Sequence, residues 1–167
     1  KCLRKMGKLI NGKWTIRSII TSDKTGKYDR LPRTFLDNIS KKDEKFKPDS
    51  KRYHLYVSYA CPWATRTLIY RQLKGLDKHI SVSVVHPDML EDGWKFDDSY
   101  PGATKDHLYN KKFLREIYQK ADPSVTTSVT VPVLWDKKNE TIVNNESSRI
   151  IRIFNSNFND LTGNQNN

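Results

Sequence analysis

The sequence predicts an α/β fold in which a mixed central sheet is flanked by helices. Two observations at the start of the domain carry this prediction. An apolar run at 53–57 has the length of a buried strand, and the stretch at 62–75 after it has the pattern of a helix closed by a glycine. A second run, at 79–85, is rich in β-branched residues and also has strand length. Strand, helix and strand in this order make a βαβ unit with parallel strands and a right-handed crossover.

The rest of the chain extends this unit to β-α-β, α, β-β-α, which is the order of a thioredoxin-like fold. The run 129–136 has the composition of a strand, but Pro132 lies inside it and cannot donate to a sheet. We therefore expect Pro132 at a sheet edge or at the start of its strand. The further predicted elements are a long polar loop at 86–107, a helix at 109–120, a return strand at 141–143 and a last helix from 145 to about 154.

The most informative stretch is the junction between the first strand and the first helix, Tyr59-Ala60-Cys61-Pro62-Trp63-Ala64. Pro62 fits the first helical position, where a missing N–H costs nothing. Cys61 then caps the helix, with its sulfur near the unpaired amides of the first turn. The helix dipole favours an anion there, so we expect thiolate character, and a thiolate is the nucleophile of sulfur exchange. The alternative is a buried structural cysteine, but burial alone does not require the adjacent proline.

Three parts are expected along the chain. Residues 1–50 are predicted to form an irregular basic N-terminal extension wrapped on the core, because glycines and prolines interrupt them. Within this part, 14–16 and 18–20 have the composition of a small hairpin. Residues 51–155 are predicted to be the thioredoxin-like domain. The Asn-rich residues 156–167 are predicted to be a loose tail or the start of a linker.

The net charge of +11 raises the question of a nucleic-acid or membrane partner. Residues 1–52 hold 16 Lys or Arg and 6 Asp or Glu, whereas residues 53–167 are nearly balanced. The charge therefore belongs to the extension, where acidic residues are mixed in and no binding motif or aromatic stacking platform accompanies it. We expect a solvated extension, with no nucleic-acid partner and no membrane partner.

Cysteine and hydropathy patterns restrict the remaining classes. The chain has two cysteines, Cys2 and Cys61, too few for a disulfide framework and without a Cys-x-x-Cys pair. No Cys/His spacing fits a zinc site, so no metal is expected. No apolar run approaches the length of a transmembrane helix, and no signal peptide is visible. These features favour a reducing, cytoplasmic location.

Five stretches of the predicted domain carry the motifs of a known family: Tyr56–Ala64, Asp92–Phe96, Ala121–Pro123, Val129–Asp136 and Val143–Ser148. Through these stretches the chain is similar to the N-terminal half of the glutathionyl-hydroquinone reductases, the xi class of glutathione transferases, which are related to the omega class. Cys-Pro-Trp-Ala is fairly specific within this group, and the set of motifs in this order is strongly specific.

The resemblance implies a glutathione site on the thioredoxin-like domain. Cys61 matches the nucleophile, and Trp94 matches a tryptophan that packs on glutathione. Val131 precedes Pro132, which is cis in this superfamily, and its backbone pairs with the cysteinyl part of glutathione. The residues that match the binding site for the γ-glutamyl end are Glu146 and Ser147, and Tyr59, Pro62 and Trp63 would shape the pocket around the cysteine.

Each of these residues also has a structural alternative. Pro132 could be an ordinary edge-strand proline, and Glu146 and Ser147 could be capping residues at a helix start. Trp94 could anchor its loop in the core, and packing alone could explain the aromatic residues beside Cys61. One departure from the family stands at Thr127-Ser128, where family members often carry Gly-Arg. The anion contact expected there would be lost, or supplied by Lys111, Lys112 or Arg115.

The resemblance also implies a reaction and its partners. Cys61 would attack the sulfur of a glutathionylated quinol or small disulfide, and a second glutathione would resolve the mixed disulfide, so glutathione is the only co-substrate. Family members continue into a helical C-terminal domain that binds the hydroquinone, and the full-length protein is expected to be a homodimer. The alternative is a glutathione-binding domain with only general omega-like thiol transferase or dehydroascorbate reductase activity. A nucleic-acid-binding protein is the third hypothesis.

Overall fold

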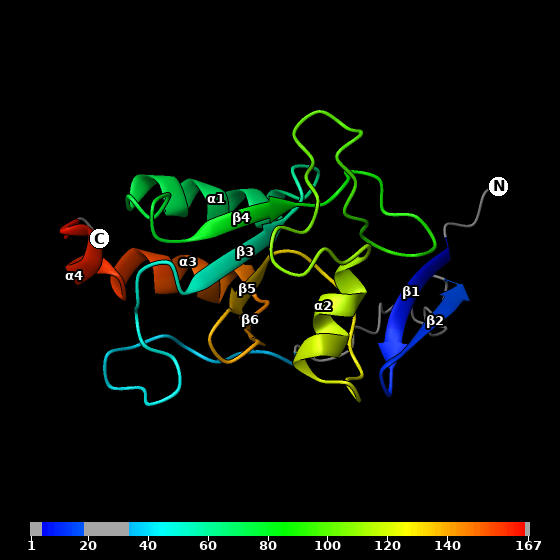
Figure 1. The fold of residues 1–167 in the computed structure, drawn as a ribbon, viewed down its shortest axis with the longest axis horizontal. Helices are drawn as coiled ribbons and strands as arrows, with labels where there is room; N and C mark the ends of the chain where they lie inside the picture. The colour runs from blue at the N-terminus through cyan, green and yellow to red at the C-terminus, as the bar shows by residue number, and fades with distance from the viewer. Residues whose placement is uncertain (1–4, 19–33, 166–167) are drawn as a thin grey trace, which may run out of the picture.

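The computed structural model describes residues 5–18 and 34–165, and its centre is a four-stranded mixed sheet in the order β4-β3-β5-β6 (Figure 1). β3 pairs in parallel with β4, as the βαβ unit predicts, and β5 runs antiparallel to both of its neighbours. The thioredoxin-like fold class predicted from the sequence is therefore confirmed. The strands are β3 (Tyr53–Val57), β4 (Ser81–Val84), β5 (Val133–Asp136) and β6 (Thr141–Asn144).

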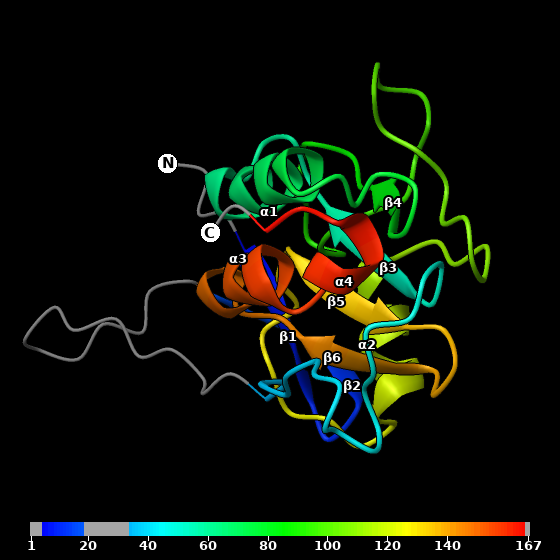
Figure 2. The ribbon, with the colours of Figure 1, turned by 90° about the vertical axis from the view of Figure 1, so that its left-hand side faces the viewer.

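Helices cover both faces of this sheet. α1 (Pro62–Leu73) and α3 (Ser147–Ser156) lie side by side on one face, and α2 (Leu114–Ala121) covers the other (Figure 2). α3 is amphipathic and buries Ile150, Ile153 and Phe154. The contact between α1 and α3 brings the beginnings of the two helices to the same end of the sheet.

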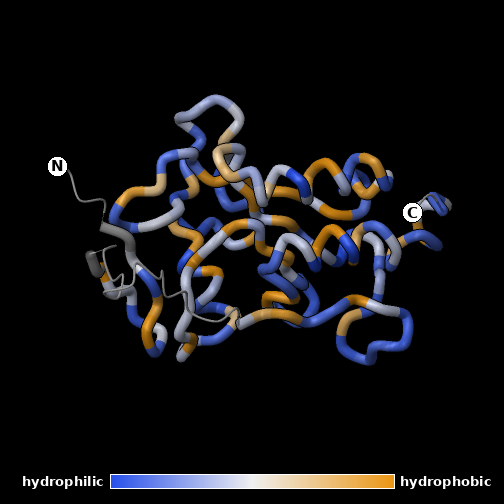
Figure 3. Tube along the Cα trace, turned by 180° about the vertical axis from the view of Figure 1, so that it is seen from behind, coloured by the Kyte–Doolittle hydropathy of each residue, from blue (hydrophilic) through white to orange (hydrophobic). Residues whose placement is uncertain are grey.

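The core is built on the sheet, whose strands and covering helices carry many hydrophobic residues, coloured orange in Figure 3. All residues of β3 and β5 are buried. Aromatic side chains fill much of this space, and the Trp135 indole N–H donates to the Tyr109 hydroxyl over 3.0 Å. Two of the enclosed polar groups, His54 and the Arg52–Asp136 pair, have hydrogen-bond partners inside the domain.

The first enclosed polar group is His54, which is fully buried in β3. Its Nδ1 lies 2.7 Å from the Ser81 hydroxyl and its Nε2 lies 2.9 Å from the Ser83 hydroxyl, both on β4. Burial, with a smaller contribution from the nearby His107, lowers the pKa of His54 from its ordinary 6.5 to about 3. His54 is therefore neutral in the folded protein throughout the physiological range.

The second is the ion pair between Arg52 and Asp136. The Arg52 guanidinium donates to both carboxylate oxygens of Asp136, over 2.9 and 2.7 Å, and Asp136 is fully buried. The hydrogen bond to Asp136 is the largest cause of a raised pKa at Arg52. This bidentate pair joins the residue before β3 to the end of β5.

The N-terminal part differs from the prediction. Residues 5–18 are not irregular: they form an antiparallel hairpin of β1 (Lys5–Ile10) and β2 (Lys13–Ser18). The predicted pairing of 14–16 with 18–20 is wrong, because 14–16 lies within β2 and pairs with β1, and residues 19–20 lie outside the described residues. Asn11 and Gly12 form the turn, both with positive φ, as a tight hairpin turn requires. The backbones of Leu9 and Thr127 exchange two hydrogen bonds of 3.0 Å, which dock the hairpin on the domain.

The C-terminal residues and β5 bring two further corrections. The expectation of a loose tail from residue 156 is wrong for the first part of that stretch, because α4 (Asn159–Thr162) follows α3 and Phe158 is buried. The Phe158 ring meets Tyr53 edge to face at 5.8 Å, so the core continues past α3. β5 begins at Val133, after Pro132, rather than at residue 129, because a proline has no N–H for a sheet with neighbours on both sides.

Candidate functional site

Cys61 caps α1, as the proline at the next position predicts. Its backbone is extended, and its carbonyl oxygen accepts hydrogen bonds of 3.0 Å from the amides of both Ala64 and Thr65. The side chain is half-buried, and its sulfur makes no hydrogen bond with the helix amides. Its polar contact is instead with the Val131 carbonyl oxygen, 3.9 Å from Sγ. The thiol therefore lies at a helix start and beside a backbone segment from across the domain.

Val131 and Pro132 present that segment. The peptide bond between them is cis, as the resemblance implies. Both residues are buried, and they directly precede β5, next to the strand that leads into Cys61. Backbone peptide groups that lie beside a thiol, just before a strand begins, could form hydrogen bonds with a short bound peptide. Two of the predicted site residues, Cys61 and Val131, are therefore in contact.

Glu146 and Ser147 form the start of α3. Glu146 is the N-cap, and its carboxylate accepts from the Ser148 amide at 3.3 Å, so the predicted capping alternative is part of its role. Ser147 is almost fully buried, with 4 % of its surface exposed. Its hydroxyl oxygen accepts two hydrogen bonds from Arg66, from Nε over 3.1 Å and from Nη2 over 2.6 Å.

Arg66 is the residue that the sequence reasoning missed. It lies on α1, in the turn after Cys61, and its Nη2 is also 4.0 Å from a carboxylate oxygen of Glu146. The guanidinium carbon lies 5.0 Å from the centre of the Trp63 ring, which is a cation–π contact. Arg66 thus joins α1 to the start of α3, a contact between positions 81 residues apart that no local pattern signals.

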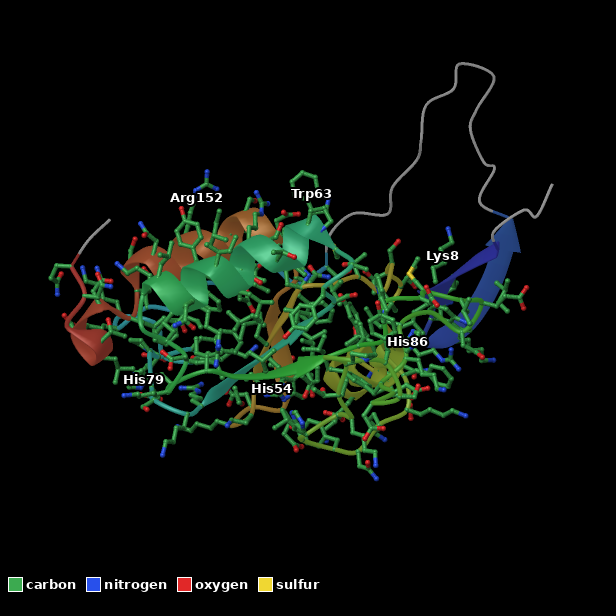
Figure 4. The ribbon with its side chains drawn as sticks, turned by 90° about the horizontal axis from the view of Figure 1, so that it is seen from above. Lys8, His54, Trp63, His79, His86 and Arg152 are labelled. Carbon is green, nitrogen blue, oxygen red and sulfur yellow. The ribbon has the colours of Figure 1, made fainter. Side chains whose placement is uncertain are left out.

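Tyr59 and Trp63 flank Cys61 in the sequence and remain largely exposed, at 60 % and 61 %. Trp63 extends from the first turn of α1, away from the sheet (Figure 4). The Tyr59 ring lies against Gly102, where an added Cβ would come within 3.1 Å of it. Side chains this exposed are not there simply to fill the core, which was the structural alternative for Tyr59 and Trp63. Their role in shaping a pocket around Cys61 stays a prediction.

Trp94 lies on the loop between β4 and α2 and is partly buried against the core. Its carbonyl oxygen accepts from the Leu114 amide at 2.9 Å, which fixes the loop to the start of α2. The alternative role of Trp94, anchoring its loop to the core, therefore has structural support, whereas its contact with a ligand stays a prediction.

The N-terminal hairpin also contacts the same loop. The Trp14 indole N–H donates to the Glu91 carbonyl at 3.1 Å, and the Trp14 ring covers Gly93.

The described residues add two negative observations. No cluster of three or more His, Cys, Asp or Glu side chains in residues 5–18 and 34–165 could bind a metal ion. Over the same ranges, no helix has both the length and the apolar character that crossing a bilayer requires.

A helix that starts at a Cys-Pro pair, packed on a mixed sheet beside a cis-proline segment, defines a thioredoxin-like domain with a candidate thiol site. The family comparison agrees: the model for "Glutathione S-transferase, N-terminal domain" matches residues 60–157. The chain belongs to the glutathione S-transferase family.

Individual relatives narrow the resemblance. Glutathionyl-hydroquinone reductase YqjG of Escherichia coli K12 is 53 % identical over 163 residues, and glutathionyl-hydroquinone reductase PcpF of Sphingobium chlorophenolicum is 44 % identical over 159. Each match covers 93 % of this chain but only 50 % and 49 % of the relative. The chain thus spans about half the length of these curated relatives, and the predicted resemblance to the glutathionyl-hydroquinone reductases is confirmed.

Solved structures agree with the curated relatives. The glutathione-bound structure of YqjG from E. coli K-12 superimposes with a TM-score of 0.78 at 49 % identity, covering 93 % of this chain and 47 % of that one. A xi-class glutathione transferase from Natrialba magadii gives a TM-score of 0.79 at 46 % identity, with coverage of 93 % and 46 %. The fold of the described residues is therefore shared with these proteins over about half of their length.

Proposed function

We propose that this chain is the glutathione-binding half of a glutathione-dependent reductase that removes glutathione from glutathionyl-hydroquinones. The observation that carries the proposal is the position of Cys61 at the start of α1, 3.9 Å from the Val131 carbonyl, at the end of the sheet where α3 also begins. The relatives named for this activity match 93 % of the chain and support the same reaction.

Glutathione would lie across this end of the domain in an extended form. Its thiol-bearing residue would pair with the backbone at Val131, which brings its sulfur to Cys61. Its γ-glutamyl group carries an ammonium that suits the Glu146 carboxylate, and a carboxylate that suits the Ser147 hydroxyl and the first amides of α3. Trp94 would pack on the peptide from the loop before α2.

The reaction would proceed in two sulfur-exchange steps. The Cys61 thiolate attacks the glutathionyl sulfur, the carbon–sulfur bond breaks, and the ring carbon takes a proton to leave as the hydroquinone. The two sulfurs, now joined as a mixed disulfide, have supplied the two electrons that reduce the ring carbon. The thiolate of a second glutathione then attacks the disulfide, which releases glutathione disulfide and restores Cys61. This cycle uses no second protein cysteine.

A narrower activity is the second candidate: a glutathione-binding domain with only general thiol transferase or dehydroascorbate reductase activity. It would need only the thiol and the groups around it in this domain, where Cys61 lies beside the Val131 carbonyl. α1 also has large apolar side chains that are exposed to solvent, such as Leu73 at 67 %, and these could contact another domain or subunit. A homodimer for the full-length protein and a cytoplasmic location, where glutathione is kept reduced, belong to the same proposal.

The test is the reduction of a glutathionyl-hydroquinone by this chain, with Cys61→Ser and Cys2→Ser as a matched pair of variants. We expect Cys61→Ser to abolish turnover and Cys2→Ser to retain it. Turnover retained by Cys61→Ser would refute the assignment of the nucleophile. Reduction of small glutathione mixed disulfides without reduction of the hydroquinone conjugate would establish the second candidate instead.

A further inference from the structure

The Arg66 side chain contacts both residues at the start of α3, Glu146 and Ser147. It comes from α1, and its side chain is 32 % exposed, so its bonds are only partly screened by solvent. The guanidinium is held on three sides, by the Ser147 hydroxyl oxygen, the Glu146 carboxylate and the Trp63 ring. A side chain fixed in this way imposes its own geometry on its partners.

The chemistry of the guanidinium determines how the Ser147 hydroxyl is oriented. A guanidinium has five N–H donors and no acceptor. The oxygen of Ser147 must therefore accept both bonds from Arg66, at 3.1 and 2.6 Å, and its own proton must point elsewhere. A hydroxyl with its oxygen occupied and its proton directed away is a donor for an anion such as a carboxylate.

We infer that Arg66 is a positioning residue, which orients the Ser147 hydroxyl as a donor to the γ-glutamyl carboxylate and so selects ligands that carry a γ-glutamyl group. The inference rests on the proposed function, because it assumes that glutathione lies between Cys61 and the start of α3. Arg66 and Cys61 share one helix, so the same contact also sets the spacing between the thiol and the γ-glutamyl site.

A lysine could not replace Arg66 in this role. Its ammonium is a single point donor, whereas Nε and Nη2 of Arg66 converge on one oxygen from a rigid plane. A lysine would also lose the stacking of the planar group on Trp63. Selectivity for the γ-glutamyl group thus depends on the shape of the guanidinium, in addition to its charge.

The experiment compares two ligands and two arginine variants by calorimetry. The ligands are reduced glutathione and cysteinylglycine, which has the same thiol but no γ-glutamyl group. For Arg66→Met we expect glutathione affinity to fall about tenfold, the cost of one charge-assisted hydrogen bond, while cysteinylglycine affinity is unchanged. Arg152→Met is the matched control, because Arg152 projects from the exposed side of α3 (Figure 4) and its removal should change neither affinity.

Two further variants complete the test. Ser147→Ala should weaken glutathione by a similar factor, and adding Arg66→Met to it should cost little more, because both act through one hydroxyl. Arg66→Lys should behave like Arg66→Met, and it provides the same readout if the methionine variant does not fold. The inference is overturned if wild type prefers glutathione and the Arg66 variants weaken both ligands equally or neither. If wild type binds glutathione no better than cysteinylglycine, the proposed function itself fails.

Discussion

The buried His54 makes the fold sensitive to mild acid. Its pKa is about 3 in the folded protein, because the ring is enclosed between β3 and β4, and returns to 6.5 when the chain unfolds. Between these values the unfolded chain binds a proton that the folded chain excludes, so stability falls as the pH drops below 6.5. Stability from this group is complete above that value and is lost progressively toward pH 3.

The size of the effect follows from the two pKa values. A change from pH 7 to pH 5 should lower the free energy of unfolding by about 2 kcal/mol through His54 alone. Asp43 and Asp97, whose pKa values are lowered by hydrogen bonds from Phe46 and Lys95 respectively, lose their contributions only at pH values below the normal aspartate range. The interval between pH 7 and pH 5 therefore separates the contribution of His54 from those of these two aspartates.

The assay is urea unfolding followed by tryptophan fluorescence at a series of pH values under reducing conditions. The test variant is His54→Gln, which keeps a neutral hydrogen-bonding group but cannot titrate, and it should lose most of the pH dependence. His79→Gln is the control, because His79 lies outside the core and, among the described residues, its ring forms a hydrogen bond only with the Ser50 hydroxyl. The reasoning is refuted if His54→Gln loses as much stability between pH 7 and pH 5 as the wild-type chain.

Two other predictions concern the stability of the domain and the loop that carries Trp94. Asp136→Asn should lower the free energy of unfolding by about 3 kcal/mol, since it leaves Arg52 without its buried partner, and urea unfolding measures this. A loss below about 1 kcal/mol would mean that the pair contributes no more than a surface salt bridge. Trp14→Ala removes the cover of Gly93 and the bond to Glu91, so we expect glutathione affinity to fall several-fold while the free energy of unfolding changes less than for Asp136→Asn. Unchanged affinity would show that the hairpin does not support the site.

The sequence was sufficient for the parts of the fold that depend on local signals. β3 and the start of α1 lie where the apolar run and Pro62 predict them. Cys61 is the cap for the same local reason. The hairpin at 5–18 also has a local signal, because Asn-Gly, here Asn11-Gly12, is a strong turn pair between two strands. The prediction instead paired the apolar groups at 14–16 and 18–20, and so placed the turn wrongly.

The remaining differences depend on contacts that are distant in sequence. The boundary of β5 depends on β6 pairing beside it, which makes the strand central and excludes Pro132. Phe158 looks like part of a polar tail until it packs against Tyr53. The role of Arg66 exists only because α1 lies against α3, so an arginine in an ordinary helix position gains two bonds to Ser147.

The central claim is that Cys61 is a reactive monothiol that exchanges with glutathione, and one measurement tests it directly. The chain is incubated with glutathione disulfide and its mass is determined intact and after proteolysis, alongside Cys61→Ser. The account predicts a single glutathione adduct on Cys61, no adduct on Cys2, and release of the adduct by reduced glutathione. An adduct on Cys2 alone, or an unmodified Cys61, would contradict it.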